Sequence, residues 1–136
     1  MIGKFLVAVF AVLGLVHLYW AAGGRIGQAA AIPQVGNKPS FQPGTIATIA
    51  VAFALFGAAG VVAIRSGILL DPTLSFLATI GCWVLAAILA MRAIGDFRLV
   101  GFFKRVTGTP FARADSLFYS PLCAVLAVLV AEVARG

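Results

Sequence analysis

The chain has 136 residues, of which 62% are hydrophobic and 10% charged, with a net charge of +6 and a mean hydropathy of +1.11. A soluble domain is about half apolar and about a quarter charged, so this composition excludes an ordinary soluble protein. It leaves no soluble domain that could bind nucleic acid. The positive charge instead favours contact with membrane lipids that carry anionic headgroups.

The apolar residues lie in four long stretches, each near the ~20 residues that a helix needs to cross a bilayer. They predict a single domain, residues 1–136, with spans at about 4–24, 44–65, 72–94 and 115–134. The first stretch is longer than a typical signal-peptide core and ends in the bulky sequence HLYW, so we expect it to remain as a span. The expected fold class is therefore all-α, a four-helix transmembrane bundle.

The loops differ in length and in charge. The first loop, residues 25–44, is long and rich in Pro and Gly, which is typical of a functional lid or a disordered segment. In the short second loop, Asp71 and Pro72 predict the N-cap and first residue of the third helix. Seven of the ten Lys and Arg residues fall in the first and third loops. We therefore expect these loops in the cytoplasm and both termini outside it.

The third loop contains an amphipathic pattern. Leu99, Phe102, Phe103 and Val106 follow the spacing of one helical face, and Arg98 and Arg105 fall opposite. This pattern predicts a basic interfacial helix between the third and fourth spans, with aromatic rings at the acyl boundary and cations among phosphates.

The fourth span contains a proline. Asp115 and Ser116 are good capping residues, so we expect the helix to begin there with Pro121 inside it. Pro121 lacks the N–H that would bond to the carbonyl of Leu117. The result is either a simple bend or a bend that opens a pocket near Tyr119 and Ser120.

His17 is the only histidine, and it lies well inside the first span. Its imidazole needs a polar partner in lipid, and the candidates are Asp96, Asp115 and Tyr119. Asp96 could instead pair with Arg92, four residues earlier on the third helix. One histidine cannot supply both axial ligands of a haem, and Cys82 and Cys123 form no CxxC motif. We therefore expect no metal and no cofactor. The two thiols are expected to be inert packing groups, although a disulfide between adjacent helices is sterically possible.

Three segments resemble the signature segments of a family of small bacterial integral-membrane proteins whose domain has no known function. They are HLYWAAGG at 17–24, RAIGDFRLVGFFKR at 92–105 and FARADSLFYSPLC at 111–123. The resemblance covers nearly the whole chain and implies four helices in a bacterial inner membrane, but no activity. It points to these residues: His17, Trp20, Gly24, Arg92, Asp96, Phe97, Gly101, Lys104, Asp115, Tyr119, Ser120 and Pro121.

Two classes of function remain open, and no enzyme motif decides between them. The favoured class is a binding or transport module with a polar pocket for a lipid headgroup or small anion. Its expected pocket residues are His17, Trp20, Arg92, Asp96, Lys104, Tyr119 and Ser120. The alternative is a small membrane enzyme acting on a lipid or quinone, with His17 as acid/base and Asp96 or Asp115 orienting it. A structural partner subunit or a homo-oligomer is also open.

Overall fold

The structure is a computed structural model that describes residues 1–70 and 72–136. Three long helices are continuous, and the fourth is built from three consecutive pieces. The bounds are α1 (Ile2–Ala21), α3 (Thr45–Arg65), α4 (Ser75–Ile94), and then α5 (Pro110–Ala114), the π-helical turn η1 (Asp115–Tyr119) and α6 (Ser120–Arg135). All four are long and apolar enough to cross a membrane. The predicted all-α bundle and the multi-pass membrane class are therefore confirmed.

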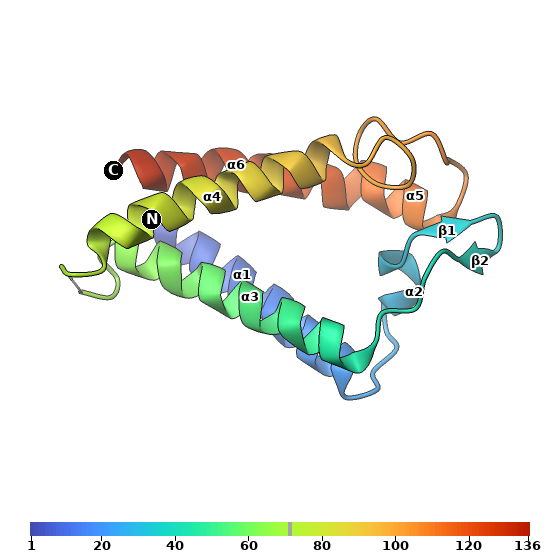
Figure 1. Cartoon of the computed structure of the whole chain (residues 1–136), viewed down its shortest axis with the longest axis horizontal. Helices are drawn as coiled ribbons and strands as arrows, with labels where there is room; N and C mark the ends of the chain where they lie inside the picture. The colour runs from blue at the N-terminus through green and yellow to red at the C-terminus, as the bar shows by residue number, and fades with distance from the viewer. Residues whose placement is uncertain (71) are drawn as a thin grey trace.

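The four helices form two pairs that diverge from one end of the molecule. Helix α1 packs along α3, and α4 packs along α6. Figure 1 shows the two pairs close together near the chain termini and far apart at the opposite end, like the arms of a V. The buried core lies at the closed end and includes Leu6, Phe10, Val62, Leu126 and Val130. Alanines of α3, α4 and α6 in the same cluster let the helix backbones approach closely there.

The first loop folds across the open end of the V (Figure 1). It contains the short helix α2 (Gln28–Ala31) and two short antiparallel strands, β1 (Gln34–Val35) and β2 (Lys38–Pro39). Helix α2 and strand β1 contact α5, so the loop joins the two arms. The Trp20 Nε1–H donates a 2.8 Å hydrogen bond to the Ile26 carbonyl and fixes the start of the loop.

The third loop is not the interfacial helix that the sequence predicted. Residues 95–109 form turns and bends, and Gly95, Phe97 and Gly101 have positive φ angles of 93°, 61° and 89°. A Cβ on Gly95 would overlap the Val100 carbonyl, and one on Gly101 would overlap that of Ile94. The loop therefore folds back tightly on the end of α4, which a regular helix could not do.

Two predicted helix starts also differ from the structure. The C-terminal helix begins at Pro110, where the Thr109 side chain accepts a 3.0 Å hydrogen bond from the Ala112 N–H, rather than at Asp115 and Ser116. The distortion expected at Pro121 takes the form of the π-helical turn η1 just before it. Helix α4 begins at Ser75 rather than Pro72, and Asp71 lies outside the described residues.

Candidate functional site

A buried ion cluster joins the end of α4, the third loop and η1. Arg92 Nη2 lies 2.8 Å from Asp115 Oδ1, and Lys104 Nζ lies 3.0 Å from Asp115 Oδ2. The side chains of Asp115 and Lys104 are 0% and 3% exposed. We call Arg92, Lys104 and Asp115 the clasp, because together they hold the loop against two helices.

The hydrogen-bonding groups of the clasp are almost fully used. The three ammonium hydrogens of Lys104 match three acceptors, namely Gly101 O at 2.9 Å, Asp115 Oδ2 at 3.0 Å and Ser116 Oγ at 2.7 Å. Asp115 Oδ2 also accepts a 2.8 Å bond from the Gly101 N–H. A buried ion pair is stable only when its hydrogen-bonding groups find partners, as those of Lys104 and Asp115 do. Lys104 therefore has no donor left for an anion, and Arg92 Nη1 is a buried nitrogen without a partner in the described residues.

Asp96 organises its own loop instead of pairing with His17 or Arg92. Its Oδ1 accepts hydrogen bonds of 2.9, 2.7 and 2.9 Å from the N–H groups of Arg98, Leu99 and Val100. Slight burial raises the pKa of Asp96, but these three N–H groups outweigh it and hold the pKa below its usual value. A carboxylate that accepts three backbone donors is thus a local cap, as in an Asx turn.

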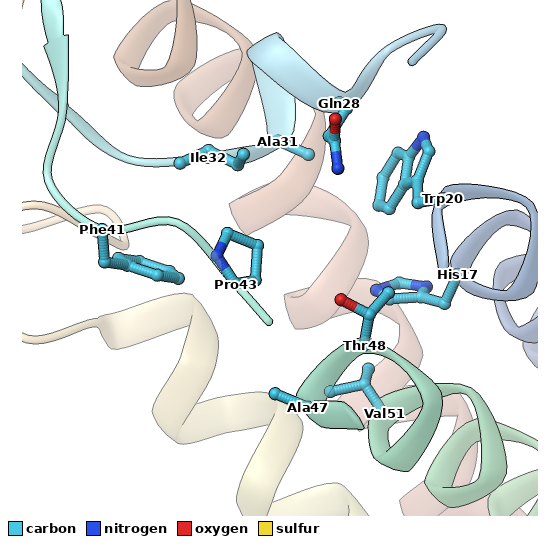
Figure 2. Close-up of a pocket in the computed structure, with 10 residues that line it drawn as sticks. All are labelled: His17, Trp20, Gln28, Ala31, Ile32, Phe41, Pro43, Ala47, Thr48 and Val51. Carbon is cyan, nitrogen blue, oxygen red and sulfur yellow. The ribbon is translucent and has the colours of Figure 1, made fainter. Parts of the chain in front are cut away.

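A cavity of about 280 Å³ lies between the first loop and the parts of α1 and α3 that face it. We call it the wedge cavity. Its walls come from α1, α2, α3 and the segment before α3, and none of the described residues that line it is charged. The apolar part of the lining includes Trp20, Ile32, Phe41, Pro43 and Val51, whereas the polar part is His17, Gln28 and Thr48. Figure 2 shows His17 beside Thr48, with Gln28 and Trp20 next to each other above them.

The imidazole of His17 is fixed by contacts within its own helix. Its Nδ1 lies 2.7 Å from the carbonyl oxygen of Leu13, one turn earlier. Its ring also packs edge-on against the Trp20 indole, with ring centroids 5.0 Å apart at an angle of 63°. The predicted contact between His17 and Asp96 or Asp115 is therefore wrong, because both carboxylates are committed to other partners.

Five of the residues predicted from sequence fall into two groups. His17 and Trp20 line the wedge cavity, whereas Arg92, Lys104 and Asp115 form the clasp. Outside both groups, Tyr119 packs against Phe111 with ring centroids 6.2 Å apart, and Ser120 is fully buried. Cys82 and Cys123 are free thiols.

The first loop contributes to the cavity, which the sequence did not predict. Gln28, Phe41 and Pro43 line it, together with Thr48 near the start of α3. The available signal was an aromatic residue and prolines in a long loop between two spans, a composition that suits a cover over an apolar site.

Residues 10–130 match a family described as a protein of unknown function, DUF3995. The chain belongs to the DUF3995 family. The DUF3995 match includes both the wedge cavity and the clasp, which confirms the resemblance found in the sequence. No curated protein and no solved structure matches the chain.

Proposed function

We propose that this DUF3995 protein binds an amphipathic, lipid-like molecule in the wedge cavity. The supporting observation is an apolar cavity with three polar side chains that lies between the first loop and the membrane helices α1 and α3. Ligand sites are commonly apolar clefts of about 300–1,000 Å³ with a few fixed polar groups, and they often lie between the helices of bundles. At about 280 Å³ the cavity suits a headgroup and the first part of an apolar chain.

The clasp gives less support for binding a small anion. The ammonium hydrogens of Lys104 are all matched, and Arg92 is paired with the same carboxylate, so Nη1 of Arg92 is the one nitrogen of the clasp left without a partner among the described residues. The exposed residues Arg98, Arg105 and Arg113 remain suited to contact anionic headgroups at the membrane surface. With the orientation favoured by the basic residues, the wedge cavity would lie near the cytoplasmic face of a bacterial inner membrane.

The structure gives less support to the catalytic alternative, because His17 contacts neither Asp96 nor Asp115. That alternative placed Asp96 or Asp115 beside His17 to orient the imidazole, and the Leu13 carbonyl holds the ring instead. Binding therefore remains the function that the geometry supports best.

Tryptophan fluorescence tests this proposal. Of the two tryptophans, Trp20 lines the cavity and Trp83 on α4 is 45% exposed, so Trp83→Phe leaves Trp20 as the only reporter. In phosphatidylcholine nanodiscs, dodecan-1-ol brominated at carbon 3 should quench Trp20 saturably, because bromine quenches indole on contact.

A pair of variants on α3 separates the cavity from bulk lipid. Ala47 lines the cavity, and Ala50 is exposed one turn later outside it. Ala47→Phe should remove the saturable quenching, and Ala50→Phe should preserve it. Equal quenching in the two variants would reject the wedge cavity as the binding site.

A further inference from the structure

The hydrogen bond to Leu13 determines which ring nitrogen of His17 donates and which accepts. A carbonyl oxygen can only accept, so Nδ1 must carry the proton in the 2.7 Å contact with Leu13 O. In the neutral ring the second nitrogen, Nε2, is then an acceptor. Nε2 has no partner in the described part of the chain, while the ring that carries it lines the wedge cavity.

Thr48 also offers the cavity an acceptor and no donor. Its hydroxyl hydrogen is used in a 3.1 Å bond from Oγ1 to the Gly44 carbonyl, so only the oxygen lone pairs remain. Thr48 is 8% exposed and lies beside His17 at the same end of the cavity (Figure 2). Two neighbouring acceptors therefore face a space with apolar walls and no charged residue in its described lining.

We infer that the ligand of the wedge cavity carries a hydroxyl donor, as an alcohol or phenol on an apolar body, and not an anionic headgroup. This inference rests on the proposed function and adds the chemical class of the ligand. A phosphate or carboxylate would meet these two acceptors, the neutral amide of Gln28 and no cation, so most of its hydration would be lost without compensation. A hydroxyl can donate to His17 Nε2 or Thr48 Oγ1, while its hydrocarbon part contacts the apolar walls.

The position of the acceptor is fixed before binding. The Leu13 carbonyl and the Trp20 indole hold the imidazole, and Trp20 is itself held by its bond to the Ile26 carbonyl. A prearranged acceptor costs little conformational entropy when the ligand binds. The hydroxyl should therefore contribute measurable selectivity even in a small cavity.

Three headgroups on one brominated chain test the inference in the Trp83→Phe protein. The probes are 3-bromododecan-1-ol, its methyl ether and its phosphate monoester, titrated in phosphatidylcholine nanodiscs with Trp20 as reporter. The ether accepts but cannot donate. The alcohol should bind roughly three- to tenfold more tightly than the ether, the range of one net hydrogen bond. The phosphate should bind more weakly than the alcohol.

Variants at the two acceptors show whether the selectivity comes from them. His17→Phe keeps a ring but removes the acceptor, and Thr48→Val keeps the shape but removes the oxygen. Each should lower the alcohol-to-ether ratio toward one and leave binding of the ether intact, which also shows that the variant is folded. If a variant does not fold, the headgroup series on the otherwise unaltered protein still decides the question.

The possible outcomes distinguish this inference from the proposed function. Equal affinity for alcohol and ether, with both blocked by Ala47→Phe, overturns the hydroxyl inference and leaves the binding site in place. Tighter binding of the phosphate overturns it as well. Quenching that Ala47→Phe leaves unchanged for every probe overturns the proposed function itself, because the molecules would then be ordinary bilayer neighbours of Trp20.

Discussion

Lys104 and Asp115 form a 3.0 Å ion pair across eleven residues of sequence, and both side chains are almost completely buried. The pair connects the third loop to the π-helical turn at which the fourth helix changes its winding. Arg92 approaches the other carboxylate oxygen from α4. One carboxylate thus holds three separate segments, and this explains why charged residues lie inside such an apolar chain.

Lys104→Met should strongly destabilise the protein. The change leaves Asp115 buried with one cation fewer, and breaking a buried ion pair costs about 3–5 kcal/mol. The midpoint of thermal unfolding in detergent should therefore fall. Arg98→Met is the matched control, because it removes one positive charge from an exposed side chain of the same loop. A similar loss in both variants would show that net charge, and not the clasp, is responsible.

The third loop should loosen in acid through Asp96. The folded-state pKa of Asp96 is lowered from its usual 3.8, so the carboxylate stabilises the loop above the unfolded pKa. That stabilisation is lost as the pH falls below 3.8 and through the lower folded-state pKa. Hydrogen exchange at the amides of Leu99 and Val100 should then accelerate beyond its ordinary pH dependence.

Asp96→Asn provides the control for this pH effect. The amide oxygen can still accept hydrogen bonds from the loop, but it cannot titrate. Protection in the variant should be weaker at neutral pH and should show no additional loss in acid. An identical acid transition in the variant would assign the effect to another group.

The sequence predicted the membrane-spanning helices better than it predicted the contacts between side chains. The four spans were predictable because length and hydropathy are local properties of each segment. The interfacial helix was wrong although Leu99, Phe102, Phe103 and Val106 have helical spacing. That pattern ignored the backbone reversal made by the glycines at 95 and 101, which approach each other too closely for side chains.

The partner of His17 was not predictable because it depends on the angle between the helix pairs. In a parallel bundle, the ends of the first and third spans would lie side by side, and His17 could reach Asp96. In the V-shaped arrangement those ends separate, and the first loop occupies the space between them (Figure 1). Arg92, Lys104 and Asp115 were selected as candidates, but their mutual pairing required the fold of the third loop.

Gly101→Ala should destabilise the protein more than Gly108→Ala. Both glycines have positive φ, 89° and 84°, so each alanine carries a similar backbone cost of about 1–2 kcal/mol. Only at Gly101 would the added Cβ also overlap the Ile94 carbonyl, whereas Gly108 has nothing within 4 Å. Urea or thermal unfolding of the two variants measures the difference. Equal destabilisation would mean that the close approach at Gly101 relaxes at little cost.

Both termini should lie outside the cytoplasm. Seven of the ten basic residues lie in the first and third loops or in the helix turns next to them, and segments rich in Lys and Arg usually remain on the cytoplasmic side. A reporter that fluoresces only in the cytoplasm should stay dark when fused after Gly136. The same reporter inserted at Gly36, an exposed turn with open space around it, should fluoresce. The reverse pattern would place the wedge cavity at the outer face, where the basic loops could not contact the anionic lipids of the inner leaflet.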